Sequence, residues 1–162
     1  MVKLEIAIQS LADNDVDFVI VGGVAIRIHS SAYVTLDLDF CYARTKENLG
    51  KIVSALAQFN PRPRDFPIDL PYFFDERSLQ NSTNFTFETD IGDIDLLGEV
   101  AGVGTYLEVE KSSVIFELYE RDVRVLSIDA LINAKRAAGR TKDLLVLPEL
   151  EALREALSDE ED

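Results

Sequence analysis

Two aspartates that share one face of an expected strand are the residues of this chain best suited to chemistry. Asp37 and Asp39 are separated by a single leucine in the run Thr-Leu-Asp-Leu-Asp-Phe that begins at Thr35. In an extended strand alternate side chains share a face, so both carboxylates point one way and the apolar side chains between them point into a core. Aspartate is depleted in strands, and like charges on one face repel each other. The pair therefore predicts a bound cation.

A glycine doublet precedes the acidic pair. Gly22-Gly23 ends the apolar run Phe18–Val21, which predicts a buried strand, and we expect a helix over residues 24–31 directly behind it. Glycine lets a backbone approach phosphate closely, and the start of a helix supplies free N–H donors and a positive dipole end. Together with the acidic strand, this order favours a nucleotide phosphate and cations of the Mg²⁺ kind, which prefer hard oxygen ligands.

A third carboxylate is expected from another strand, because one metal can bridge the nucleotide while a second activates the attacking hydroxyl. Asp95 is the best candidate, since its neighbours Ile94 and Leu96 would face the core. Asp93 shares the same face and is the rival. It lies at an expected turn, where aspartate is common for local hydrogen-bonding reasons. The sequence favours Asp95 and leaves Asp93 open.

The elements that must position these residues follow from the hydrophobic periodicity. We expect helices over residues 2–14, 45–58, 128–138 and 142–157, with Thr45 and Ser127 as N-caps and Gly139 as a helix breaker. Strands are expected at 35–42, 84–89, 94–97, 114–119 and 123–126, the last four as two hairpins. Residues 60–81 hold four of the five prolines and predict an irregular insertion near the substrate.

The glycine doublet, the Asp-x-Asp pair and Asp95 together resemble the signature of the DNA polymerase beta-like nucleotidyltransferase superfamily. The run from Leu131 to Leu144, with Thr35 and the pattern Thr89-x-x-Gly92-x-x-Asp95, resembles its AbiEii-type branch of minimal nucleotidyltransferases, which includes toxin-like enzymes. The matched segments span residues 18–147. The resemblance implies an α/β (α+β) fold, in which helices flank a mixed sheet and further helices follow at the C-terminus.

The resemblance also implies an activity, namely transfer of a nucleoside monophosphate from a nucleoside triphosphate to an acceptor. It implies a two-metal site for Mg²⁺ or Mn²⁺, with Asp37, Asp39 and Asp95 as metal ligands and catalytic residues. Asp143 would orient a cation or belong to the acceptor side. The implied nucleotide-binding residues are Gly22, Gly23, Thr35, Lys135, Arg140 and Lys142.

Ordinary structural explanations stay open beside these roles. An isolated Asp-x-Asp pair is more often a solvated strand face. Lys135 can equally be an exposed lysine on a helix, and Arg140, Lys142 and Asp143 can be a charge cluster at a helix start. The aromatic run Tyr72–Phe74 is either a base-stacking wall or a satellite of the core. A further alternative is a non-catalytic nucleotide-binding or interaction module of the same fold, such as one half of a toxin–antitoxin pair.

The composition describes one acidic domain. The chain has 162 residues, 47% of them hydrophobic, and a formal net charge of -14, so we expect a single nucleotidyltransferase-like domain over residues 1–157 and a solvated acidic tail at 158–162. The charge argues against salt-driven attachment to nucleic acid, and it leaves transfer RNA, a protein or a cationic small molecule open as acceptor. With no apolar stretch of about 20 residues and no signal-peptide layout, we expect a cytoplasmic protein with no membrane contact.

Overall fold

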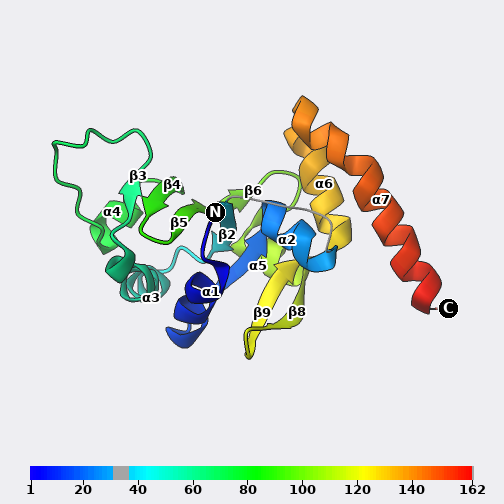
Figure 1. Cartoon of the computed structure of the whole chain (residues 1–162), viewed down its shortest axis with the longest axis horizontal. Coiled ribbons are helices and arrows are strands. Elements are labelled where there is room, and N and C mark those ends of the chain that lie inside the picture. Colours follow the sequence, from blue (N-terminus) through cyan, green and yellow to red (C-terminus); the bar gives the residue numbers. More distant parts are fainter. Residues whose placement is uncertain (31–36, 162) are drawn as a thin grey trace.

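A seven-stranded mixed sheet forms the centre of the computed structural model, which describes residues 1–30 and 37–161 (Figure 1). The strand order is β3-β4-β5-β2-β1-β9-β8. The strands are β1 (Phe18–Val21), β2 (Asp37–Tyr42), β3 (Arg62–Pro63), β4 (Asn84–Thr89), β5 (Gly92–Leu97), β8 (Ser113–Leu118) and β9 (Arg121–Leu126). At the centre, β1 is antiparallel to β2 and parallel to β9, while β2 is parallel to β5. The two expected hairpins, β4–β5 and β8–β9, are both confirmed.

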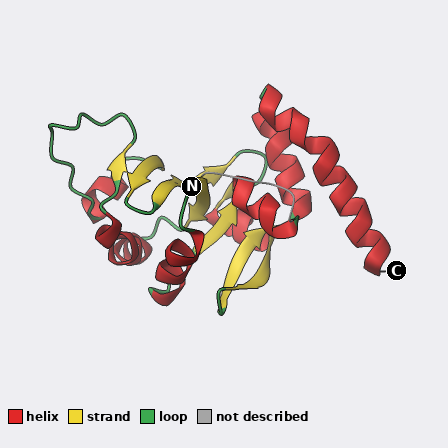
Figure 2. Cartoon of the chain, viewed as in Figure 1, coloured by secondary structure: helices red, strands yellow, loops and turns green. Residues whose placement is uncertain are grey.

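Helices flank this sheet, as Figure 2 shows. They are α1 (Leu4–Asp13), α2 (Gly22–His29), α3 (Lys46–Leu56), α4 (Glu76–Gln80), α5 (Tyr106–Lys111), α6 (Ile128–Ala138) and α7 (Thr141–Glu161). Helix α1 packs on α3, α2 packs on α6, and α6 packs on α7. The mixed fold with flanking and C-terminal helices is therefore the one expected. No described helix is both long and apolar enough to cross a membrane.

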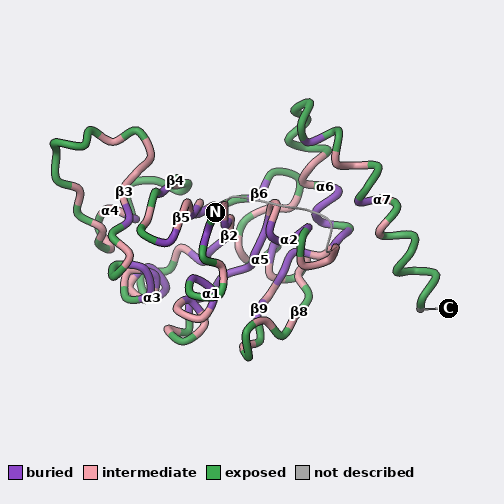
Figure 3. The backbone as a smooth tube through the Cα atoms, in the orientation of Figure 1, coloured by how far each residue is buried: buried purple, intermediate pink, exposed green. Residues whose placement is uncertain are grey.

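The core explains why the aspartates face away from it. Figure 3 shows that buried segments gather in the sheet and in the helices packed on it. Leu38 and Phe40 on β2, and Ile94 and Leu96 on β5, are fully buried. Each such side chain stabilises the fold by about 1.5–3 kcal/mol relative to an exposed one, so the registers of both strands are strongly determined. Because side chains alternate along a strand, Asp39 and the other strand aspartates must lie on the opposite face. The sequence-based assignment of faces is confirmed for the described residues.

Capping residues set the helix boundaries. The Thr45 hydroxyl accepts from the N–H of Asn48 at 3.2 Å, and Ser127 accepts from Ala130 at 3.2 Å, so both expected N-caps are confirmed. Gly139 ends α6 with a left-handed φ of 65°. The helix after β1 starts at Gly22 rather than at residue 24.

The proline-rich segment is more ordered than expected. It contains β3 and also α4, which begins with a capping box between Asp75 and Ser78. Arg62 stabilises the long loop of this proline-rich segment, because its guanidinium donates hydrogen bonds to Pro67 O and Leu70 O at 2.9 Å each. Local periodicity does not detect these features because β3 is only two residues long and α4 only five, and because the loop contacts depend on tertiary packing.

The aromatic run in this segment belongs mainly to the core. The rings of Tyr72 and Phe74 lie 6.2 Å and 5.4 Å from that of the buried Phe87. Only Phe73 of the three is exposed. The arrangement favours the satellite-core interpretation over a base-stacking wall.

Two further segments differ from expectation. The short strands β6 (Glu99–Val100) and β7 (Gly104–Thr105) pair with each other, and α5 follows them. Helix α7 continues through Ser158–Glu161, so these acidic residues extend a helix. Figure 1 shows the end of α7 leaning away from the sheet.

Candidate active site

Four aspartates lie in two facing pairs on one side of the sheet. The parallel pairing of β2 with β5 places Asp37 opposite Asp93 and Asp39 opposite Asp95. Burial raises the pKa of Asp39 to about 7, helped by the charge of Asp95, a hydrogen-bonding contact with it, and the charge of Asp37. Burial also raises the pKa of Asp95. The fold thus concentrates negative charge where it is poorly solvated.

Asp95 is better placed than its rival Asp93. The Asp95 side chain is 19% exposed and that of Asp93 is 40% exposed. Asp95 is also the partner that Asp39 faces across the strand pair. The geometry therefore favours Asp95 as the third carboxylate.

Gly22 allows β1 and α2 to approach this acidic face. Its φ is +65°, a left-handed conformation that side chains disfavour, and a Cβ there would collide with the carboxylate of Asp39. The contact arises because Val21 pairs directly with Asp39. Glycine is thus required at position 22 for both conformation and space, and the start of α2 lies beside the aspartates.

A second cluster of charges, made of Lys135, Arg140 and Asp143, lies where α6 meets α7. Lys135 Nζ is 3.2 Å from Asp143 Oδ1, and Arg140 Nε is 2.7 Å from Asp143 Oδ2. Asp143 is fully buried, and its hydrogen bonds to Arg140 and then Lys135 lower its pKa despite that burial. The cluster is consequently a built ion-pair network and not only a solvated helix start.

The helical spacing of the sequence indicated that Asp143 would be buried, but the charged residues around it favoured a solvated helix start. Asp143, Leu147 and Leu150 follow the i, i+4, i+7 spacing of one helix stripe. Leu150 is fully buried and Leu147 packs partly against the core. An aspartate at the first position of that stripe is expected to point inward and to need cationic partners.

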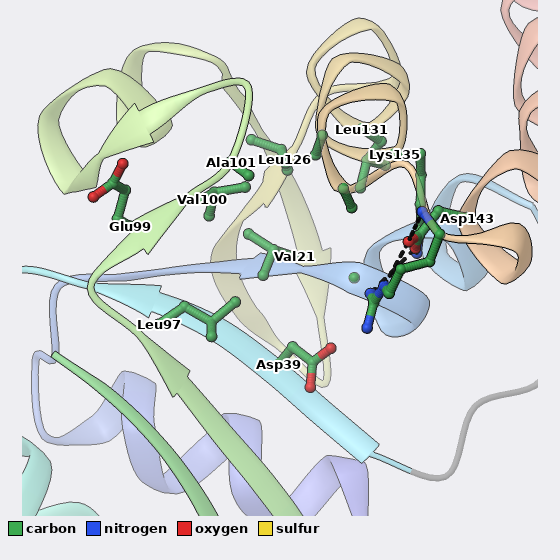
Figure 4. A pocket seen from close by; sticks show the side chains of 14 residues that line it. Val21, Asp39, Leu97, Glu99, Val100, Ala101, Leu126, Leu131, Lys135 and Asp143 are labelled. Carbon is green, nitrogen blue, oxygen red and sulfur yellow. Dashed lines mark hydrogen bonds and ion pairs between the residues drawn. The ribbon is translucent and has the colours of Figure 1, made fainter.

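A cleft made of two adjoining pockets joins the two charged regions, and both pockets are lined by Gly22, Asp39, Lys135 and Arg140. One pocket, of about 180 Å³, lies between the sheet and α6 and is mainly apolar, and Figure 4 shows Asp39 and Lys135 on two sides of it. The other pocket, of about 170 Å³, is mainly polar. Residues that line the polar pocket are Gly22, Gly23, Asp37, Asp39, Lys135, Arg140 and Lys142. The expected site residues are thereby brought together, except Asp95, which lies next to Asp39, and Thr35, which lies outside the described residues.

The acidic face suits a divalent cation. Asp39 Oδ1 is buried without a hydrogen-bond partner in the described chain, and its crowded carboxylate would be stabilised by positive charge. Carboxylate oxygens are the ligands that Mg²⁺ and Mn²⁺ prefer. Within residues 1–30 and 37–161, however, no three His, Cys, Asp or Glu side chains converge into a preformed metal site.

Arg64 is a site residue that the sequence did not reveal. Its Nη2 atom is 3.2 Å from Asp95 Oδ1 and 3.5 Å from Asp93 Oδ2. The positive charge of Arg64 opposes the effect of burial on the pKa of Asp95. No local pattern links residues so far apart in the chain, because their contact depends on the pairing of β3 with β4.

Asp39 is expected to make the protein less stable as the pH rises. Its pKa is raised from 3.8 to about 7, so between these values the folded state holds a proton that the unfolded chain has lost. This contribution is present below about pH 4 and is lost as the pH approaches 7. Relative to Asp39→Asn, the wild-type free energy of unfolding should fall by on the order of 2 kcal/mol from pH 4 to 7.5. Urea titrations across this range measure the difference, and parallel pH profiles would contradict it.

Asp143 is expected to matter for stability. Asp143→Ala should lower the free energy of unfolding by about 2–3 kcal/mol, because the mostly buried ammonium of Lys135 loses its carboxylate. Asp129→Ala is the matched control, because Asp129 also lies in the first turn of a helix. Its side chain is 75% exposed and lies 3.5 Å from Arg154, so Asp129→Ala should lower the free energy of unfolding by less than about 0.5 kcal/mol. Urea unfolding compares the two. Equal losses would mean that only the helix dipole is involved.

The sheet topology and flanking helices are those of a nucleotidyltransferase-type fold, and two of the three solved structures of similar fold described next carry that name. One is a crystal structure from Thermotoga maritima of a protein assigned as a nucleotidyltransferase, with a TM-score of 0.57, 15% identity, and coverage of 98% of this chain and 96% of that chain. Another is the solution structure of the antibiotic-resistance factor ANT(2'')-Ia, with a TM-score of 0.53, 17% identity and coverage of 97% and 90%.

A third is an antigenic nucleotidyltransferase-like protein from Paracoccidioides brasiliensis, with a TM-score of 0.54, 13% identity and coverage of 94% and 77%. No protein-family model matches the chain, and no curated protein sequence matches it either. At these identities the similarity establishes the fold.

Proposed function

We propose that this chain is a metal-dependent nucleotidyltransferase that transfers a nucleoside monophosphate from a nucleoside triphosphate to an acceptor and releases pyrophosphate. The observation that carries the proposal is a cleft with carboxylates on one side and basic residues on the other, beside the two glycines that begin α2. The nucleotidyltransferase-type fold supports it. We further propose that residues 1–157 act as one domain.

In this proposal each side of the cleft has a distinct role. Asp37, Asp39 and Asp95 would hold Mg²⁺ or Mn²⁺, which when bound lowers the pKa of the acceptor hydroxyl and stabilises charge on the phosphoryl group. Asp95 would help to accept the hydroxyl proton. On the other side, Gly22 and Gly23 would offer backbone N–H groups to phosphate oxygens. The basic residues Lys135, Arg140 and Lys142 would offset the charge of the triphosphate.

Asp143 would act as a positioning residue in this arrangement. It bonds to Lys135 from α6 and to Arg140 at the start of α7, so it fixes both cations relative to the cleft. Because one carboxylate pairs with two cations, the cluster of Lys135, Arg140 and Asp143 keeps a net positive charge, which would attract a phosphate group.

We infer an AbiEii-type enzyme from the sequence run at residues 131–144, and this branch makes RNA a reasonable acceptor in a toxin–antitoxin setting. The acidic chain equally suits a cationic small molecule, and the similar structure ANT(2'')-Ia is an antibiotic-resistance factor. Induction in cells separates the two acceptors. Growth arrest that Asp39→Ala abolishes supports RNA or a protein, whereas drug resistance without toxicity supports the small molecule.

Labelling with radioactive nucleotides tests the proposed reaction itself. The protein is incubated with each α-labelled nucleoside triphosphate, Mg²⁺ or Mn²⁺, and cell extract, and transfer of label to RNA, protein or a small molecule is the expected result. No transfer with any nucleotide, together with no nucleotide binding by calorimetry, would contradict it. If Asp37→Asn then leaves a biological effect unchanged, the non-catalytic interaction module is the better account.

A further inference from the structure

A row of paired residues connects Arg64 to the acidic face. The N–H of Arg64 donates to Thr86 O at 2.8 Å, which continues the antiparallel register of β3 with β4. Thr86 pairs with Asp95 on β5, and Asp95 pairs with Asp39 on β2. Residues directly opposite each other on neighbouring strands point to the same face. Arg64 therefore extends over the short Thr86 side chain toward the two aspartates.

The contact between Arg64 and Asp95 is close but incomplete. Only Nη2 reaches the carboxylates, at 3.2 Å from Asp95 Oδ1 and 3.5 Å from Asp93 Oδ2. The strongest arginine–carboxylate pairs are bidentate, with two parallel hydrogen bonds. Here Arg64 Nε is buried without a partner in the described chain, and so is Asp39 Oδ1 on the other side of Asp95. The guanidinium thus compensates the charge of Asp95 in part and leaves Asp39 Oδ1 without a partner in the described chain.

Arg62, a neighbouring arginine, has contacts of a purely structural kind. Arg62 lies two residues earlier and on the same face, but its guanidinium donates to the backbone carbonyls of Pro67 and Leu70 and stacks on the ring of Phe66 at 5.4 Å. Arg62 therefore organises the loop. Arg64 instead places its charge on a carboxylate proposed to bind metal.

We propose that Arg64 is a positioning residue, an internal cation that holds Asp95 in the free protein and that a divalent cation must displace. This inference rests on the metal site of the proposed function. Because Oδ1 of Asp95 cannot bind the guanidinium and a cation at full strength together, Arg64 weakens binding of free metal. The absence of three converging metal ligands in the described chain agrees with a third carboxylate that is turned toward Arg64.

Manganese binding to the full chain without nucleotide tests this role. Mn²⁺ affinity, measured by electron paramagnetic resonance and calorimetry, should rise about tenfold in Arg64→Gln, since one competing charge is removed a few ångströms from the site. Arg64→Lys keeps the charge and should stay closer to the wild type. Adding Asp95→Asn to Arg64→Gln should remove the gain. The matched control, Arg62→Gln, deletes the same charge two residues earlier in the chain, and its affinity should stay within about twofold of the wild type.

The outcomes separate this inference from the proposed function. A folded Arg64→Gln protein with unchanged or weaker Mn²⁺ affinity overturns the inference, and so does an equal gain in Arg62→Gln. Transfer assays are run in parallel. If the wild type transfers label but Arg64→Gln shows no gain in Mn²⁺ affinity, the inference alone is overturned. A gain in Mn²⁺ affinity in Arg64→Gln, together with no transfer and no nucleotide binding by any variant, overturns the proposed function alone.

A second measurement applies if Arg64→Gln does not fold. In ¹⁵N-labelled wild-type protein, saturation with Mg²⁺ should shift the side-chain Nε–H resonance of Arg64 and leave that of Arg62 in place. An unchanged Arg64 resonance at saturating Mg²⁺ overturns the inference.

Discussion

Asp39→Asn is expected to lower nucleotidyl transfer by on the order of 1,000-fold while the protein becomes no less stable. The loss follows because Asp39 is proposed to hold the metal, and the amide of asparagine is a neutral and weaker ligand. Stability should not fall, because the wild-type carboxylate is buried, crowded by Asp95 and Asp37, and has one oxygen without a partner. At pH 8 the variant should gain about 1 kcal/mol.

Single-turnover transfer assays and urea unfolding on the same preparations measure both effects. The control is Asp122→Asn, which removes an exposed strand aspartate on β9 and should change neither quantity. A loss of activity that comes with a loss of stability would point to a folding defect. Wild-type activity in Asp39→Asn would remove the residue from the site.

Asp95→Asn and Asp93→Asn should differ strongly, although they change the same chemical group two residues apart on one face. We expect a loss of at least about 100-fold for Asp95→Asn and less than about threefold for Asp93→Asn. The reason is position: Asp95 faces Asp39 and is 19% exposed, whereas Asp93 is 40% exposed. The amide oxygen that Asp95→Asn introduces can still accept from Arg64, so the local structure should persist.

Transfer rates at saturating Mn²⁺ compare the two variants, because weak metal binding alone is then overcome. If the larger loss falls on Asp93→Asn, the rival carboxylate is the third ligand. Equal large losses would mean that both carboxylates take part.

Local patterns in the sequence were sufficient for most of the sheet and for the acidic face. Alternation along β2 and β5 separates buried leucine, isoleucine and phenylalanine from aspartate, and a one-residue slip would bury charge. Thr45 and Ser127 cap helices through bonds to residues three positions away, so their effect is also local. The missed strands β3, β6 and β7 are two residues each, which is too short for a periodic signal.

What the sequence by itself determined, then, is which strand residues share a face and where the helices capped by Thr45 and Ser127 start, because both depend on neighbours a few positions away. The tertiary structure alone decided which faces meet. It seated Gly22 against Asp39, buried Asp143 between two cations, and brought Arg64 over Asp95. These contacts join distant strands and helices, and their energies depend on burial and charge, which emerge only when the chain is packed.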